Sequence, residues 1–427
     1  MGALNSLLGI AVLLLIAFLL SSNKKAINVR TVLGALVLQI GIGALILYVP
    51  AGREALLAAA EGVSKVISYG NDGINFLFGG LVSDKMFEVF GGGGFVFALR
   101  VLPPIIFFSA LISVLYYLGI MQVVIRILGG ALQKVLGTSK SESMSAAANI
   151  FVGQTEAPLL VKPYIKSMTN SELFAVMCGG LASVAGAVMI GYAGMGVPLP
   201  YLIAASFMAA PGGLLFAKIL HPQTESFKDE LSEDDIEEKP SNVIEAAAVG
   251  AFSGMQLAMN VGAMLLAFIA LIAMLNGFIG WVAGLVGFEG VTLQSLLGYV
   301  FQPLAWVIGV PWGQEAQVAG SLIGQKLVVN EFVAYADFVN YLPNKEGVIA
   351  SGVTLSPKTI AIITFALCGF ANLSSIAILI GGLGGMAPNR RGDVARMGIK
   401  AVIAGTLSNL MSAAIAGFFI GLGGAVM

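Results

Sequence analysis

Two glutamates lie in apolar stretches where a carboxylate is costly without a partner. Glu156 belongs to the segment VGQTEAP, and Glu331 belongs to the segment VVNEFVAY. A charged side chain inside a membrane costs about 2.5–3.5 kcal/mol on insertion scales, so we expect a substrate donor, a cation or a proton to offset it. Carboxylates accept hydrogen bonds and repel anions, which favours an uncharged, polyhydroxylated substrate. The simpler alternatives are that Glu156 caps local backbone amides and that Glu331 reaches external water.

Further polar side chains accompany these acids. Gln154 and Thr155 precede Glu156, and an amide beside a hydroxyl can read the edge of a heterocyclic base. Asn372 and Ser375 follow Phe370 in an otherwise apolar stretch, where they either join helices or contact a ligand. Phe370 either stacks on a flat ring or packs in the core.

Oxygen-bearing residues near two glycine-containing breaks suggest a sodium site. Sodium sites in transporters often use carbonyl groups that are freed where a helix breaks. Asn149 and Val152 precede Gly153, and Ser183 follows the run Cys178-Gly179-Gly180. These residues are the candidate ligands.

The composition predicts a membrane protein. The chain has 427 residues, of which 58% are hydrophobic and 11% charged, with 55 Gly and a net charge of -1. The composition excludes a disordered chain, which would be less hydrophobic, and a nucleic-acid binder, which would be more basic. It also excludes a disulfide scaffold, because two Cys cannot crosslink a chain of this length. The sequence contains no HExxH, GxSxG or Walker A motif, so it gives no support to an enzyme.

Hydropathy predicts eight transmembrane helices. A helix needs about 20 apolar residues to cross a bilayer. The expected spans are 4–21, 31–50, 94–119, 172–195, 198–219, 250–286, 357–381 and 398–424, with surface helices at 54–68 and 120–137. The stretch 250–286 is long and should be strongly tilted. Lys24, Lys25 and Arg30 place the first loop in the cytoplasm, so both termini are expected outside.

An acidic segment divides the chain into two halves. Residues 221–240 hold ten charged residues, eight of them acids. Asp234-Asp235-Ile236-Glu237-Glu238 superficially matches a metal-binding DDxxE pattern, but we interpret 221–242 as a solvated cytoplasmic loop.

Two segments are apolar but interrupted, and they predict re-entrant hairpins. The segment 141–169 breaks at 152–158, and 311–342 breaks at Ile323-Gly324-Gln325-Lys326. Their limbs are too short to span, and the flanks of the first are cytoplasmic while those of the second are external. The pair Gly153-Gln154 and the pair Gly324-Gln325 each precede a span with a polar break. Two opposed hairpins in inverted repeats imply a polar site near the midplane.

Three strings of the sequence resemble the concentrative nucleoside transporters in their bacterial form. They are GQTEAPL from Gly153, NEFVAY from Asn330 and FALCGFANLSS from Phe365, in that order. The resemblance implies a homotrimer in the bacterial inner membrane, with scaffold and transport domains and elevator-type uptake of nucleosides. It also implies roles for individual residues. Gln154, Thr155, Glu156 and Val188 would contact the base, Glu331, Asn372 and Ser375 the ribose, Phe370 the nucleoside, and Asn149, Val152, Ser183 and Val184 the sodium ion.

The expected organisation follows from these elements. Residues 1–119 form the N-terminal scaffold, 120–220 the first repeat, 221–242 the acidic loop, 243–287 a long tilted scaffold helix and 288–427 the second repeat. We predict an all-α sodium–nucleoside symporter that favours pyrimidine nucleosides such as uridine. Proton coupling through Glu156 or Glu331, a channel, and an intramembrane enzyme using the acidic loop are the alternatives.

Overall fold

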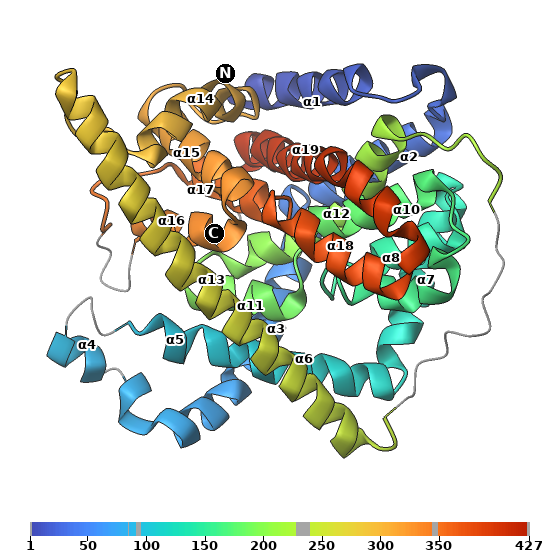
Figure 1. Ribbon diagram of the computed structural model, residues 1–427, viewed down its shortest axis with the longest axis horizontal. Coiled ribbons are helices and arrows are strands. Elements are labelled where there is room, and N and C mark those ends of the chain that lie inside the picture. The colour runs from blue at the N-terminus through green and yellow to red at the C-terminus, as the bar shows by residue number, and fades with distance from the viewer. Residues whose placement is uncertain (1, 84, 91–94, 228–239, 344–348, 425–427) are drawn as a thin grey trace.

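The protein is helical throughout the part of the chain described by the computed structural model, residues 2–83, 85–90, 95–227, 240–343 and 349–424 (Figure 1). Helices α1 to α7 are Gly2–Leu19, Val29–Leu47, Pro50–Phe78, Lys85–Phe90, Phe97–Arg100, Leu102–Tyr117 and Ile120–Leu136. Helices α8 to α13 are Lys140–Ala148, Lys162–Ile165, Asn170–Ala182, Gly186–Gly194, Leu199–Leu220 and Val243–Leu285. Helices α14 to α19 are Leu293–Val307, Gln314–Val328, Glu331–Phe338, Pro357–Leu367, Ser374–Met386 and Arg391–Gly423.

Apolar helices lie at all eight expected spans, and six of these spans are long enough to cross a membrane by themselves. Six helical stretches of the described chain are long and apolar enough to cross a membrane: Val29–Leu47, Phe97–Tyr117, Asn170–Gly194, Leu199–Leu220, Val243–Leu285 and Pro388–Gly423. The shorter apolar helix α1 and the pair α17–α18 complete the eight. The acidic motif at 234–238 lies outside the described residues.

Several helix ends differ from the predicted ones. The surface helix predicted at 54–68 extends over Pro50–Phe78, because Pro50 starts it and no proline or positive-φ residue interrupts it before Gly79. The last helix begins at Arg391, seven residues before its apolar stretch, because charged residues extend a helix into the aqueous phase. Hydropathy therefore located the apolar centres of helices and not their polar ends.

The first hairpin has unequal limbs. Helix α8 starts with a capping box formed by Ser139 and Glu142 and ends at Ala148, with Asn149 as its C-cap. The returning limb is a 3₁₀ turn, η4 at Ala157–Val161, followed by the short helix α9. Prolines at the starts of both pieces lack a backbone N–H, which prevents one continuous helix. Lys218 of α12 donates hydrogen bonds to Glu142 and to Ser171, so the base of this hairpin is tied to the core.

The break predicted in the second hairpin at residues 323–326 is wrong. Helix α15 runs without interruption to Val328, and the chain breaks at Val329 and Asn330, where Asn330 caps α16. Gly324 serves packing instead of a turn, since a Cβ there would lie 2.9 Å from the Cβ of Leu297 on α14. Gly324-Gln325 is therefore no structural counterpart of Gly153-Gln154.

Two spans are broken in the middle, as expected. The first break lies between α10 and α11 at residues 183–185, and the second lies between α17 and α18 at residues 368–373. The backbone N–H of Phe370 donates to the carbonyl of Ser183 at 3.2 Å, so the two breaks meet. Cys178 lies within α10, whereas Cys368 is the C-cap of α17 at the start of the second break.

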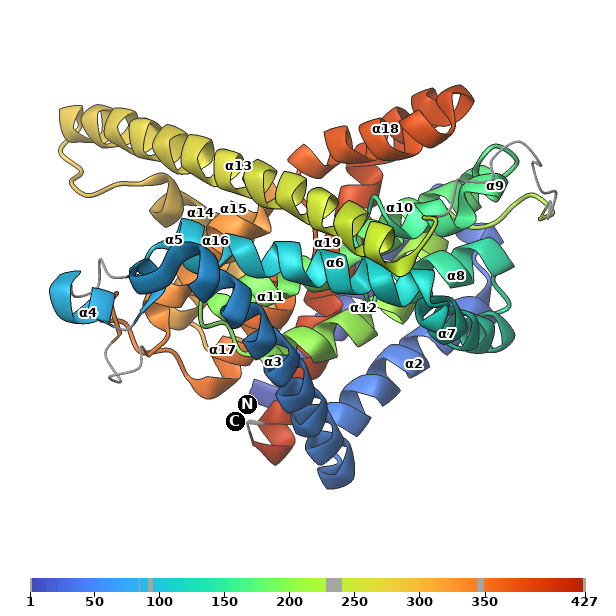
Figure 2. The same cartoon turned by 90° about the horizontal axis from the view of Figure 1, so that it is seen from below.

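Burial separates a central bundle from peripheral helices. In the apolar windows of α10–α11 and of α12, 94% of the residues are buried, whereas 22% are buried in those of α2, α5–α6 and α13. Helix α13 has 43 residues and runs obliquely across the other helices (Figures 1 and 2). At 1.5 Å per residue it is about 65 Å long, roughly twice the hydrocarbon thickness, which requires a strong tilt or an extension beyond the membrane.

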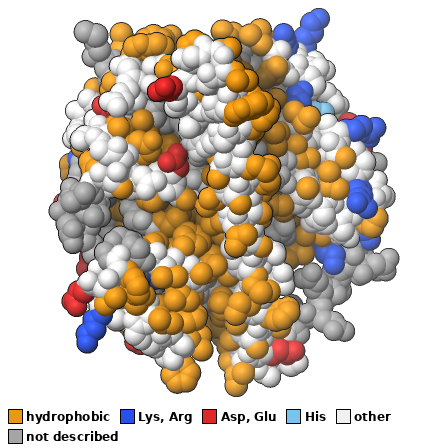
Figure 3. All heavy atoms as spheres, turned by 60° about the vertical axis from the view of Figure 1, so that its left-hand side comes forward, with side chains coloured by type: hydrophobic (Ala, Val, Ile, Leu, Met, Phe, Trp, Pro, Cys, Tyr) orange, Lys and Arg blue, Asp and Glu red, His pale blue; other side chains and the backbone are white. Residues whose placement is uncertain are grey.

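Hydrophobic side chains cover much of the face that α13 crosses (Figure 3). Phe252, Leu266, Met274, Phe278 and Trp281 of this helix are all more than half exposed in a single subunit. Exposed apolar surface of this extent marks contact with lipid or with another subunit.

Glycines allow α13 to pack closely on α6. A Cβ at Gly254 would lie 2.7 Å from the Cβ of Ser109 and 2.8 Å from the Cα of Ile106. Gly250, one turn earlier, has equally short approaches to Ser113. This contact explains part of the glycine excess, because small residues let membrane helices approach one another.

We predict that Gly254→Val destabilises the protein by about 1–3 kcal/mol, because the added atoms force α13 away from α6. Gly277→Val is the matched control on the same helix, since a Cβ there meets nothing within 4 Å. The melting temperatures of both variants are measured by thermal unfolding of the purified proteins in detergent. Equal melting temperatures for the two variants would contradict a tight α6–α13 contact.

Candidate functional site

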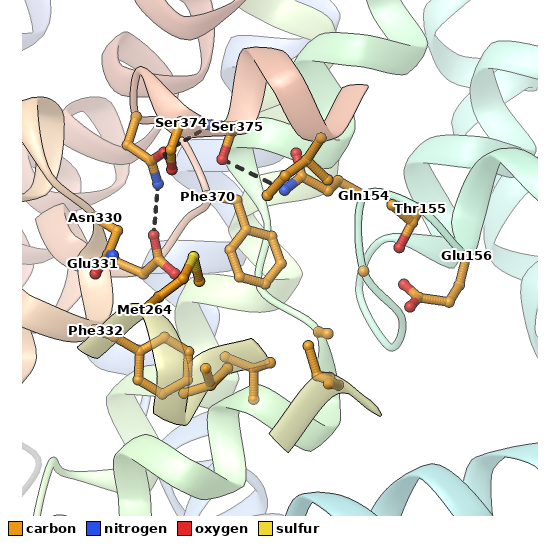
Figure 4. Close-up of a pocket in the computed structure, with 17 residues that line it drawn as sticks. Gln154, Thr155, Glu156, Met264, Asn330, Glu331, Phe332, Phe370, Ser374 and Ser375 are labelled. Atoms are coloured by element: carbon orange, nitrogen blue, oxygen red, sulfur yellow. Dashed lines mark hydrogen bonds between the residues drawn. The ribbon is translucent and has the colours of Figure 1, made fainter. Parts of the chain in front are cut away.

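A pocket lies where the hairpins and the broken spans meet, and α13 closes one side of it (Figure 4). Its cavity volume is about 110 Å³, and it is partly open to solvent. All eight residues predicted to contact substrate line it: Gln154, Thr155, Glu156, Val188, Glu331, Phe370, Asn372 and Ser375. They come from both hairpins, from α11, from the second break and from the start of α18.

Glu331 is the buried acid of the pocket. It is the first residue of α16 and only 4% exposed, so it does not reach external water. Its carboxylate accepts hydrogen bonds from Nδ2 of Asn372 at 2.8 Å and from the hydroxyl of Tyr192 at 3.2 Å. These donors stabilise the ionised carboxylate while leaving it acceptor capacity toward the pocket.

Asn372 is oriented by its own neighbours. Its Oδ1 accepts hydrogen bonds from the hydroxyl of Ser374 at 2.7 Å and from the backbone N–H of Ser375 at 2.9 Å. The amide nitrogen is therefore directed at Glu331. The start of α18 and the start of α16 thus form one hydrogen-bonded unit.

Gln154 connects this unit to the first hairpin. Its Nε2 donates to the hydroxyl of Ser375 at 3.4 Å. Its Oε1 is buried and has no hydrogen-bond partner among the described residues. A buried acceptor without a partner is costly, so this oxygen is suited to a donor supplied by a ligand or by water.

Glu156 is exposed, and the expectation that both acids are buried is wrong for it. It precedes η4, but its side chain makes no capping hydrogen bond there, so the capping role is not what the structure shows. The carboxylate lines the pocket beside Thr155 (Figure 4).

Apolar side chains form the remaining walls. Val188 lies on α11 and Phe370 in the second break. Leu257, Val261 and Met264 contribute a stripe of α13 with helical spacing. A flat, partly apolar ligand would therefore have apolar surface beside it and polar groups at its ends.

The predicted sodium ligands gather at the contact between the first tip and the first break. Asn149 is 1% exposed, and neither atom of its side-chain amide has a partner among the described residues. Ser183 and Val184 lie in the break, and Val152 lies in the tip. The backbone N–H of Gly186 donates to the carbonyl of Phe151 at 2.9 Å, which holds tip and break together. The unpaired amide oxygen and the nearby hydroxyl and carbonyl groups are of the kind that sodium prefers.

Tyr192 is a site residue that the sequence analysis did not predict. Its hydroxyl bonds Glu331, and its ring packs against Phe332 and Tyr335 at centroid distances of 4.7 and 4.4 Å. The stretch AGAVMIGYAG around it indicates only close helix packing, so no sequence signal pointed to this contact.

The arrangement of opposed hairpins, broken spans and a polar pocket defines the class of helical membrane transporters with inverted repeats. Three family models match the chain: "Na+ dependent nucleoside transporter N-terminus" over residues 8–81, "Nucleoside recognition" over 98–199 and "Na+ dependent nucleoside transporter C-terminus" over 201–417. The chain therefore belongs to the concentrative nucleoside transporter family.

Similar proteins agree with this assignment. A "Nucleoside permease NupC" of Helicobacter pylori is 58% identical over 99% of both chains. The mouse "Sodium/nucleoside cotransporter 1" is 38% identical over 97% of this chain and 63% of that protein. The solved structure of CNTnw in an inward-facing, substrate-bound state is 67% identical, with a TM-score of 0.95 over 100% of this chain and 99% of the other.

We predict that Tyr192→Phe weakens nucleoside uptake about tenfold, because a hydrogen bond to a charged group contributes about 1.5–3 kcal/mol. The expected change is a higher KM in uptake by liposomes, with the amount of inserted protein unchanged. Tyr299→Phe is the control, since Tyr299 is 65% exposed. An unchanged KM for Tyr192→Phe would show that Glu331 does not need this donor.

Proposed function

We propose that the protein imports nucleosides, preferably pyrimidine nucleosides such as uridine, together with sodium. The observation that carries this proposal is the distribution of polar groups across one pocket. Gln154, Thr155 and Glu156 lie on the first hairpin, and Glu331 with Asn372 lies opposite on the second hairpin and break (Figure 4). Two polar ends separated by apolar walls suit a molecule with a base at one end and a sugar at the other.

The ribose would lie beside Glu331. A carboxylate accepts hydrogen bonds from two vicinal hydroxyls, while Asn372 holds the carboxylate and Ser375 holds Asn372 through its backbone N–H. An anionic sugar would be repelled. The base would lie at the first tip, where the unpaired Oε1 of Gln154 can accept a hydrogen bond from a base N–H, and Phe370 and Val188 would pack on its faces.

Sodium coupling is supported by the position of Asn149. The unpaired amide lies four residues before Gly153, next to the tip that carries Gln154. An ion bound by Asn149, Val152, Ser183 and Val184 would order this tip against the first break. Because the same tip would contact the base, each ligand would stabilise the conformation that binds the other.

An elevator-type movement is consistent with the pocket walls. One wall belongs to α13, assigned to the scaffold with residues 1–119, and the other walls belong to the repeats 120–220 and 288–427. A pocket between a peripheral helix and a buried bundle can change sides when the bundle moves past that helix. We further propose a homotrimer in the bacterial inner membrane with both termini external, in which part of the exposed apolar surface contacts neighbouring subunits.

Purified protein in liposomes tests substrate and ion together. We expect saturable uptake of labelled uridine that accumulates with an inward sodium gradient and does not respond to an imposed proton gradient. Uptake that ignores sodium and collapses with an uncoupler would favour proton coupling, for which the exposed Glu156 offers a titratable group in the pocket. Flux that does not saturate would indicate a channel.

We predict that Glu156→Gln and Glu331→Gln each lower uridine uptake at least about tenfold, since each removes a charged acceptor worth about 1.5–3 kcal/mol. Glu61→Gln, at an exposed position of α3, should leave uptake unchanged. Initial rates are compared at equal amounts of inserted protein. Wild-type uptake by both pocket variants would refute the proposed site.

We predict that Asn149→Ala raises the sodium concentration required for half-maximal uptake about tenfold, because the variant lacks a candidate sodium ligand. The effect on uptake should be smaller at saturating sodium, since ion and nucleoside binding are coupled by about 1–3 kcal/mol. Asn260→Ala, on the exposed face of α13, is the control. An unchanged sodium dependence for Asn149→Ala would place the ion elsewhere.

A further inference from the structure

Lys326 is buried in the protein interior and is not part of the pocket. It lies in the last turn of α15 and is 2% exposed. Its ammonium donates hydrogen bonds to the carbonyl of Ala366 at 2.8 Å and to Oδ1 of Asn409 at 2.6 Å. Ala366 belongs to the last turn of α17, where carbonyls have no partner within the helix.

Asn409 extends this contact to the other broken span. Its Nδ2 donates to the carbonyl of Ala182 at 2.6 Å and to the carbonyl of Cys368 at 2.8 Å. Ala182 is the last residue of α10, and Cys368 directly follows α17. Two helix C-termini therefore meet at one side-chain amide inside the protein.

The electrostatics of this meeting point favour a positive charge. Each helix C-terminus carries the equivalent of about half a negative charge, and burial prevents water from screening it. Lys326 is the cation bonded directly to this cluster of carbonyls. The two breaks are also joined by the hydrogen bond from Phe370 to Ser183, so a cation here acts on both.

The two repeats carry different residues at the end of the first limb of each hairpin. In the first repeat, Asn149 follows the last turn of the first hairpin limb, and its unpaired amide lies against Gly179 near the end of α10. In the second repeat, the last turn of the first hairpin limb carries Lys326, whose ammonium is bonded to the end of α17. The first arrangement leaves oxygen atoms for an ion, and the second contains its own cation.

We propose that Lys326 is a tethered cation that permanently occupies the second repeat's counterpart of the sodium site. In this role it is a positioning residue: it holds the end of α17, and thereby the break that carries Asn372, in place opposite Glu331. The assignment of the counterpart site rests on the proposed function.

Chemical rescue of Lys326→Ala tests the tethered cation. The truncation leaves a cavity bordered by the Ala366 carbonyl and Asn409, which ethylammonium can enter as a donor and a cation, whereas tetramethylammonium has no N–H to donate. We expect uridine binding, measured by calorimetry on the whole purified protein, to weaken about tenfold or more and to recover several-fold with ethylammonium only. The melting temperature of the variant should rise with ethylammonium in the same way.

Two further variants separate the tethered cation from a purely structural role. Lys326→Met fills the space without charge or donors, so it should lose uridine binding and should not respond to ethylammonium. Lys358→Ala, near the opposite end of α17, is the control and should keep binding and show no amine effect. If Lys326→Ala cannot be purified, the Met variant still decides, because wild-type binding by it would overturn the proposal.

The outcomes are distinct from those that test the proposed function. Failure of the wild-type protein to bind uridine would refute the substrate, and the melting temperatures with ethylammonium would still report on Lys326. A folded Lys326→Ala protein that ethylammonium neither stabilises nor restores would overturn the tethered cation.

Discussion

Backbone groups freed by the broken spans and hairpin tips must find partners inside the protein, and much of the structure follows from this constraint. In a membrane an unpaired N–H or carbonyl costs several kcal/mol. Asn409 serves the ends of α10 and α17, Ser183 accepts from Phe370, and Phe151 accepts from Gly186. These contacts join the first hairpin, the two breaks and α19.

The candidate site lies where buried polar groups have no hydrogen-bond partner within the protein. The amide of Asn149 and the Oε1 of Gln154 are buried without partners, and Glu156 lines the pocket without a capping bond. Glu331 is different, because Asn372 and Tyr192 hold it in place before any ligand arrives. The second hairpin is thus preorganised, whereas the first tip has polar groups that a ligand and an ion would complete. Because of this difference, the first tip would be the part of the site whose structure depends on both the ligand and the ion.

The sequence predicted the centres of the spans and the first hairpin well, because apolar stretches and prolines act locally. It misplaced the break of the second hairpin, since a single Gly inside a helix and a Gly at a turn look alike in one sequence. The contact of Gly324 with α14 is what distinguishes them. The burial of Glu331 and the exposure of Glu156 were also beyond the sequence, because both acids have apolar neighbours along the chain.

Composition, hydropathy and three short strings were enough to identify a helical membrane protein, its eight spans and its family. The partners of the polar groups depended on the tertiary structure. Lys326 meets Asn409 across 83 residues, and Asn409 meets Ala182 across 227. Periodicity encodes how a segment buries its own faces, but the pairing of distant polar groups is settled only when packed helices bring orphaned carbonyls and side chains to the same place.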